Sequence, residues 1–233
     1  MMGLHKSLSV MESGVQTEFG GHTTLLICFS GIYTAPGIPI FSFRGVTSNL
    51  RCDKVYLRDL HRAWYHYGID EKITSLDMIE KYLTTLIKER GYTRVCLMGS
   101  SMGAYAAILI GHRICADQVM AFSPQTFIGK WKRLITWDRR WEEYISKIKN
   151  KDERYTDVVK YLTGSSFCDT RLDVYYCSDH RLDALHARRL KNIPGINLIP
   201  VEIGGHLVIK ALKEQGQLHK ILHDAISKSD CEF

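Results

Sequence analysis

The sequence predicts an α/β fold with a mostly parallel central sheet flanked by helices. Short apolar runs alternate with stretches of helical periodicity along most of the 233 residues, the order that builds parallel sheets with helical crossovers. The run at 24–30 (TLLICFS) is apolar almost throughout, as expected of a strand buried on both faces. The run at 94–98 leads through a glycine–serine turn into a helix rich in small residues, which is one such strand-to-helix step.

Seven apolar runs are expected to form strands, because they are short and separated by polar or helical segments. In chain order they are 24–30, 38–43, 54–57, 94–98, 118–122, 172–177 and 197–203. The runs at 38–43 and 54–57 are weaker candidates than the others.

A helix is expected over 74–90, where apolar residues recur at helical spacing. Thr74, with Asp77 three residues later, can cap its start, and Gly91 can end it. Further helices are expected at 104–110, 184–191 and 207–227, the last with Gly216 as the place for a kink.

The segment 127–166 breaks the alternation and holds Trp131, Trp137 and Trp141 among many charges. It predicts one or two amphipathic helices inserted between core strands. Two interpretations are open: the insertion forms a cap over a site, or Trp137 and Trp141, one helical turn apart, anchor it to the body. We expect a single domain over 1–233 with 127–166 as a cap-like insertion.

Composition limits the class of protein. The hydrophobic fraction of 45% in 233 residues is enough for one sizeable core. No apolar stretch is long enough for a membrane span, and the N-terminal residues do not resemble a secretory signal peptide. The cysteine count of seven is odd, without a C-x-x-C pair, which predicts free thiols in a reducing compartment. We therefore expect a cytoplasmic protein.

The formal net charge of +6 comes largely from two basic stretches. Their members are Lys130, Lys132, Arg133, Arg139 and Arg140, and Arg181, Arg188, Arg189 and Lys191. The stretches form either a solvated face or a surface that attracts an anionic substrate or cofactor. No nucleic-acid motif accompanies the charge, so we expect no nucleic-acid partner. His219 and His223 are four residues apart, but a solvated helix end explains them, and we expect no metal.

The residues Gly99 to Gly103 (GSSMG) fit the pattern G-x-S-x-G with Ser101 at its centre. A strand that turns sharply into a helix at a serine is a nucleophile elbow, and its glycines let a strained backbone pack closely. The helix that follows directs its N-terminal N–H groups at the serine oxygen. The pattern predicts Ser101 as a nucleophile.

A serine nucleophile needs a base and an acid that orients the base. His206, after two glycines at the end of a predicted strand, is the candidate base. Asp179, two residues beyond the run at 172–177, is the preferred acid, and Asp183 is its competitor. Asp183 has the alternative of capping the helix from 184 onward, and Asp173, inside the run, is disfavoured.

An oxyanion formed at Ser101 needs backbone donors. The N–H of Met102, directly after the nucleophile, is one candidate. The second is the N–H of Gly31 or Ile32, in the loop after the run at 24–30, where a glycine permits close approach.

With GSSMG, Asp179 and the Gly204-Gly205-His206 sequence, the chain resembles the α/β-hydrolase superfamily from about residue 23 onward. The resemblance implies a serine–histidine–acid triad and an acyl-enzyme. Ala104, where many relatives carry a second glycine, and the early FSGIY loop depart from the pattern of typical lipases. The GSS-x-G motif, the late GGH and AFSPQTF at 121–127 are also similar to bacterial hydrolase-fold proteins of polysaccharide biosynthesis, some of which move acetyl groups from acetyl-CoA onto sugars.

We therefore expect a serine-dependent carboxylic-ester hydrolase without a cofactor, acting on a small-molecule or saccharide ester that could be anionic. One alternative is an O-acetyltransferase that uses acetyl-CoA as donor and a saccharide as acceptor. The other is a catalytically inactive hydrolase-fold binding protein.

Overall fold

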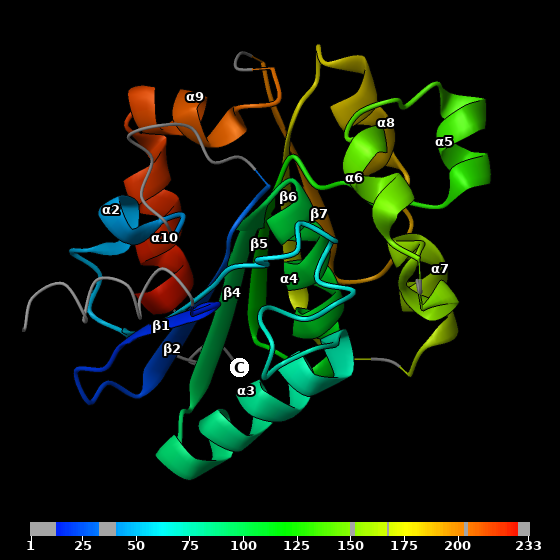
Figure 1. Cartoon of the computed structure of the whole chain (residues 1–233). Coiled ribbons are helices and arrows are strands. Elements are labelled where there is room, and N and C mark those ends of the chain that lie inside the picture. The colour runs from blue at the N-terminus through cyan, green and yellow to red at the C-terminus, as the bar shows by residue number, and fades with distance from the viewer. Residues whose placement is uncertain (1–12, 33–40, 150–151, 167, 203–204, 228–233) are drawn as a thin grey trace, which may run out of the picture.

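A computed structural model describes residues 13–32, 41–149, 152–166, 168–202 and 205–227 (Figure 1). Seven strands form one sheet in the order β1-β3-β2-β4-β5-β6-β7. All neighbouring strands are parallel except β1 and β3. The predicted α/β architecture with a mostly parallel sheet is confirmed.

Six of the seven strands follow predicted apolar runs, and β1 was not predicted. They are β1 (Val15–Glu18), β2 (Thr24–Phe29), β3 (Asp53–Leu57), β4 (Arg94–Ser100), β5 (Gln118–Phe122), β6 (Arg171–Cys177) and β7 (Ile196–Val201). The strand predicted at 38–43 is wrong in its described part, because Phe41 to Phe43 form a bend and turn before α2 (Arg44–Thr47). Residues 38–40 of that prediction, and 203 at the end of the last run, lie outside the described residues.

Helices cover both faces of the sheet (Figure 1). Side chains such as Leu25 and Ile27 face α3 (Leu76–Arg90), α4 (Met102–Arg113), α7 (Val158–Gly164) and α8 (Arg181–Arg188). Leu26 and Cys28 face α2, α9 (Val208–Glu214) and α10 (Gln217–Ser227). Successive strand residues point to opposite faces, so a sheet covered on both sides needs strands that are apolar throughout.

Local capping sets the helix ends. Ser75, not Thr74, caps α3, and its hydroxyl accepts a hydrogen bond from the N–H of Met78. Gly91 ends the helix as predicted, in the left-handed region at φ 64°. Gly216, at φ 71°, separates α9 from α10, which confirms a break at the expected kink.

The insertion holds more helices than predicted: α5 (Lys130–Thr136), α6 (Glu142–Lys147), the 3-10 helix η1 (Glu153–Tyr155) and α7. Trp141 packs against the core, whereas Trp137 is 71% exposed at the end of α5. The interpretation that both tryptophans anchor the insertion is therefore wrong for Trp137.

Two of the cysteines depart from the prediction of free thiols. Cys115 and Cys168 form a disulfide, which ties the end of α4 to the segment before β6. Cys28, Cys52, Cys96 and Cys177 are free and buried, and Cys231 lies outside the described residues. Within the described ranges, no helix has the length and apolar character needed to cross a bilayer.

Candidate active site

Ser101 lies at the turn between β4 and α4, in a backbone conformation that side chains rarely adopt. Its φ of 53° and ψ of −114° fall in a strained region for a residue with a Cβ. The N–H of Ser101 donates to the carbonyl of Phe122 at 2.9 Å, which fixes the turn to the end of β5. This is the predicted elbow, and Ser101 is 7% exposed at its apex.

The two glycines of GSSMG are required by packing. A Cβ at Gly99 would lie 2.3 Å from the carbonyl oxygen of Gly103, and a Cβ at Gly103 would lie 2.2 Å from that of Phe29. Both distances are well inside contact range. The elbow therefore depends on glycine at both places so that α4 can start directly against β2 and β4.

The imidazole of His206 meets the hydroxyl of this elbow. His206 follows β7, and its Nε2 lies 3.0 Å from Oγ of Ser101. Since β7 lies three places from β4 in the sheet, the contact joins residues that follow strands on either side of β5 and β6. The structure thus brings together the two residues that the sequence analysis paired.

The carboxylate in contact with His206 belongs to Asp183, so the placement predicted for Asp179 is wrong. Both carboxylate oxygens of Asp183 lie 3.0 Å from Nδ1 of His206, and the side chain is 1% exposed. Asp179 is exposed, and it accepts a hydrogen bond from the hydroxyl of Ser178 at 3.4 Å. Asp173, disfavoured in the sequence, is held inside β6 by Gln118.

Asp183 was misplaced because α8 begins earlier than predicted. The helix starts at Arg181 with His180 as its N-cap, so Asp183 does not cap it but lies in its first turn. The buried face of α8 consists of Asp183, Ala184, His186 and Ala187. Two polar residues at helical spacing on a buried face are the signal that could have identified Asp183, since such groups are buried only with partners.

The environment of Asp183 favours its ionised form. Burial would raise its pKa, but the hydrogen bond from His206 and the charges of His206, Arg140 and His180 hold that pKa below its ordinary value. An ionised Asp183 can only accept a hydrogen bond from Nδ1–H, so Nδ1 carries the hydrogen of the neutral imidazole. Nε2 is then free to accept a hydrogen bond from the hydroxyl of Ser101.

Arg140, in the loop between α5 and α6, joins the insertion to this carboxylate. One guanidinium nitrogen donates to Oδ1 of Asp183 at 2.8 Å, while others donate to Asp138. Asp138 accepts a further hydrogen bond from Nε2 of His186, 2.9 Å away. Nδ1 of His186 accepts from the N–H of Thr126 at 2.9 Å, which fixes the tautomer. A chain of buried polar groups therefore connects the insertion to Asp183.

We expect Arg140→Gln to destabilise the protein at pH 7 by about 3 kcal/mol, because it leaves two buried carboxylates without their cation. The pKa of Asp138, which burial would raise, is held well below its ordinary value by His186 and Arg140, like that of Asp183. A carboxylate whose pKa is lower in the folded than in the unfolded protein adds to the free energy of unfolding. That contribution is complete above the unfolded-state pKa of about 4, and it is lost as the pH falls through the lower folded-state pKa.

The difference in free energy of unfolding between Arg140→Gln and the wild type, measured by urea unfolding, should therefore become smaller below about pH 4. Arg139→Gln, at the exposed neighbouring position, is the matched control and should unfold like the wild type. A deficit that stays constant from pH 7 to pH 3 would show that the ion pairs are not its source.

The candidate oxyanion donors belong to two segments that meet at the elbow. Met102 is the first residue of α4, so its N–H has no acceptor within the helix. A Cβ at Gly31 would lie 3.1 Å from the carbonyl oxygen of Ser100, which places the loop after β2 directly beside the elbow. Ile32 follows it and is 6% exposed.

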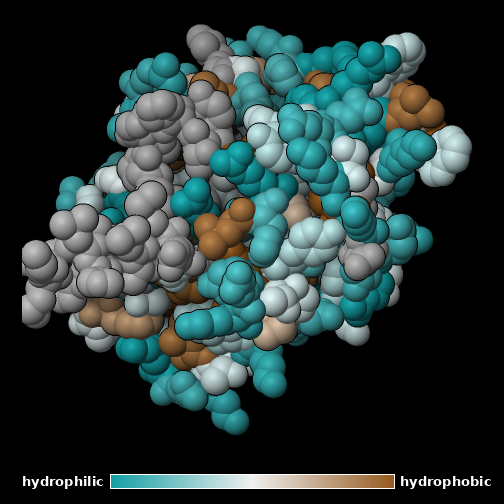
Figure 2. Space-filling view, viewed as in Figure 1, coloured by the Kyte–Doolittle hydropathy of each residue, from teal (hydrophilic) through white to brown (hydrophobic). Residues whose placement is uncertain are grey.

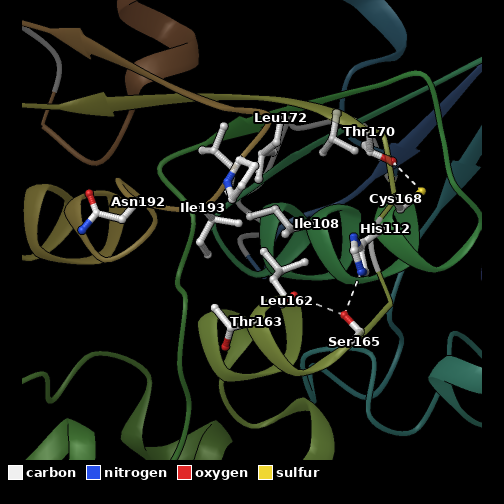
Figure 3. A pocket seen from close by; sticks show the side chains of 13 residues that line it. Ile108, His112, Leu162, Thr163, Ser165, Cys168, Thr170, Leu172, Asn192 and Ile193 are labelled. Carbon is white, nitrogen blue, oxygen red and sulfur yellow. Dashed lines mark hydrogen bonds between the residues drawn. The ribbon is translucent and has the colours of Figure 1, made fainter.

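A separate cavity of about 320 Å³ lies near the opposite ends of β5 and β6, lined by residues including Val119 and Leu172 (Figure 3). It contains a second serine–histidine contact, 2.8 Å between Oγ of Ser165 and Nε2 of His112. The hydroxyl of Ser165 donates to the carbonyl of Tyr161 at 2.9 Å, so His112 does not take its proton. This pair is therefore a structural contact. The described residues include no group of three or more side chains arranged to bind a metal ion.

No family model and no curated protein matches the chain. Among solved structures, the capsule O-acetyltransferase of Neisseria meningitidis serogroup A is similar with a TM-score of 0.65 at 14% identity, covering 90% of each chain. A mutant of that enzyme in complex with CoA is similar with a TM-score of 0.60 at 15% identity, covering 90% of this chain and 98% of the other.

Two further similar structures are hydrolases. An esterase of Pyrococcus furiosus gives a TM-score of 0.59 at 15% identity, covering 91% of this chain and 86% of the other. An α/β hydrolase enzyme from a deep-sea metagenome library has a TM-score of 0.60 at 10% identity, covering 94% of each chain. Likeness at these identities concerns the fold, and the chain has the fold of the α/β hydrolases.

Proposed function

We propose that the chain is a serine hydrolase that cleaves carboxylic esters through an acyl-enzyme on Ser101. The observation that carries the proposal is the hydrogen-bonded series from Ser101 through His206 to Asp183 at a strained elbow. A serine hydroxyl becomes a useful nucleophile when a base is within hydrogen-bond reach and a third group orients that base.

In the proposed mechanism, Oγ of Ser101 attacks the acyl carbonyl while Nε2 of His206 takes its proton. Asp183 holds the ring by Nδ1–H and stabilises the imidazolium that forms. The imidazolium returns the proton to the leaving alcohol, which leaves an ester on Ser101. Water, deprotonated by His206, then releases the acid and restores the serine.

The tetrahedral intermediate carries a negative oxygen that needs donors. We assign one donor to the N–H of Met102, the first residue of α4, and the second to the N–H of Gly31 or Ile32, in the loop beside Ser100. Preorganised donors of this kind lower the barrier because they need no reorganisation when charge develops. The first turn of α4 adds its positive dipole end.

The insertion 127–166 is proposed as a cap over this site within a single domain. Support comes from Arg140, whose contact with Asp183 places part of the insertion against the proposed acid. A cap of this kind would exclude water and hold the acceptor, and these two properties separate a transferase from a hydrolase.

Acetyl transfer from acetyl-CoA to a saccharide hydroxyl is the second candidate. It is supported by the likeness to the capsule O-acetyltransferase and to its complex with CoA. The acyl-enzyme is the same in both reactions, and the acceptor hydroxyl replaces water.

One experiment separates the candidates. The protein is incubated with p-nitrophenyl acetate or acetyl-CoA, with and without bacterial polysaccharides, and free acetate and O-acetylated glycan are measured. Ester hydrolysis predicts acetate release that no glycan alters. Acetylated glycan formed at the expense of acetate would assign the transferase, and inertness toward both donors would support an inactive binding protein.

A further inference from the structure

Helix α5 exposes an unusual set of large apolar side chains. Trp131, Leu134, Ile135 and Trp137 are exposed by 74%, 62%, 76% and 71%. Leu134 and Ile135 come three and four residues after Trp131, so both lie on the same helix face as Trp131. Figure 2 shows hydrophobic atoms over α5 at the upper right of the molecule. Contiguous apolar patches are uncommon on a protein surface and mark interaction sites.

Positive charge surrounds this patch. Lys130 and Arg139 are exposed, and neither has an ion-pair partner among the described residues. The guanidinium of Arg139 lies over the ring of Trp137 at 5.4 Å. No acidic residue occurs between Thr126 and Trp137. The exposed face of α5 therefore combines apolar and cationic groups, whereas the carboxylates of Asp138 and Glu142 lie in the adjacent groove.

A groove of about 620 Å³ lies between α5 and α6, lined by residues that include Lys130, Arg133, Arg139 and Glu142. Arg133 is only 9% exposed, and its Nε has no hydrogen-bond partner. One terminal nitrogen of Arg133 donates to the carbonyl of Arg140 at 2.8 Å, but no carboxylate pairs with the guanidinium among the described residues. The charges of Asp138 and Glu142 act on this guanidinium, but neither carboxylate forms an ion pair with it, so Arg133 keeps an unused donor to which phosphate is matched in geometry.

We infer that α5 and this groove dock the protein on a bilayer that contains anionic phospholipid. The apolar face inserts at the boundary of headgroups and acyl chains, where tryptophan is favoured. Lys130 and Arg139 attract the negative surface, and Arg133 meets a headgroup phosphate. A symmetric contact between two copies of α5 is disfavoured, because it would place the same cations against one another.

The docking surface is joined to the helix that carries Asp183. Two guanidinium nitrogens of Arg181, in the first turn of α8, donate to the carbonyl of Thr136 at the end of α5, each at 3.2 Å. The bilayer would therefore contact the protein at the carboxyl end of the parallel strands, the same end of the sheet at which Ser101 follows β4. The docking inference does not depend on the proposed catalytic function.

The test is cosedimentation of the full chain with vesicles of phosphatidylcholine alone or mixed with phosphatidylglycerol. We expect binding to the mixed vesicles that weakens at high salt, since attraction at a surface is screened. The double variant Trp131→Ser/Ile135→Ser should bind at least about tenfold more weakly, because two large apolar side chains no longer enter the bilayer. Met78→Ser, which changes an apolar residue that is 41% exposed on α3, is the matched control and should bind like the wild type.

Three results would overturn the inference. One is equal binding of the double variant and the wild type. Another is absence of vesicle binding with a concentration-dependent dimer in analytical ultracentrifugation that Ile135→Ser abolishes, which would assign α5 to a second copy. The third is CoA binding that Arg133→Gln weakens while vesicle binding stays unchanged, which would assign the groove to a soluble phosphate ligand.

Discussion

Ser101→Ala is expected to abolish labelling by a fluorophosphonate probe and to reduce ester turnover to background, a loss of about 10⁵-fold or more. The hydroxyl is the atom that becomes acylated, and no water in the same place forms a covalent intermediate. Folding should persist, because the substitution removes one hydrogen bond, worth about 1 kcal/mol. Probe labelling followed by intact-protein mass spectrometry and a thermal melt measure both effects.

Ser100→Ala is the matched control for this substitution. Ser100 ends β4, next to the elbow serine, and has no place in the proposed mechanism. It should label at the wild-type rate. Equal labelling of Ser101→Ala and the wild type would remove Ser101 from the mechanism, and loss of labelling only in Ser100→Ala would move the nucleophile by one residue.

Asp183→Asn is expected to lower kcat by about 10³- to 10⁴-fold, because the amide cannot hold the imidazole in the productive tautomer or stabilise its charged form. Asp179→Asn should change kcat by less than about threefold, since an exposed carboxylate outside the hydrogen-bonded series contributes little. Steady-state kinetics on a p-nitrophenyl ester compare the two variants, with circular dichroism to verify folding.

The pair of aspartate variants separates two assignments that the sequence left open. A large kcat loss in Asp179→Asn with a near-normal Asp183→Asn would restore the sequence-based assignment. It would also require His206 to take a different orientation from the one in which Nδ1 contacts Asp183.

Features determined by local sequence were predictable. The elbow could be recognised because a strained turn between a buried strand and a helix requires glycine at both ends, and Gly99 and Gly103 supply it. The central strands could be recognised because a sheet covered on both faces needs uninterrupted apolar runs. His206 could be selected by its place after the last strand.

Features determined by tertiary partners were not predictable. Asp183 is set by where α8 begins, and one turn of helix decides which carboxylate faces His206. The short strand β1, with Val15 as its one strongly apolar residue, exists because it pairs with β3. The bond between Cys115 and Cys168 joins positions 53 residues apart, a separation that no local pattern indicates.

The insertion shows the same division. Its amphipathic character was visible in the sequence, but the roles of its residues depend on what they touch. Arg140 belongs to the basic stretch that suggested an anionic ligand, yet its guanidinium donates hydrogen bonds to Asp138 and Asp183. Lys130, Arg133 and Arg139 have no such carboxylate partner among the described residues, and they are the ones that line the groove.

The central claim is that His206 activates Ser101 for acylation. The most direct test is to map the fluorophosphonate adduct by tandem mass spectrometry in the wild type and to measure the labelling rate of His206→Ala. The mechanism predicts an adduct on Ser101 alone and a labelling rate reduced by about 10³-fold or more without the imidazole. An adduct on another residue, or a His206→Ala variant that labels as fast as the wild type, would contradict it.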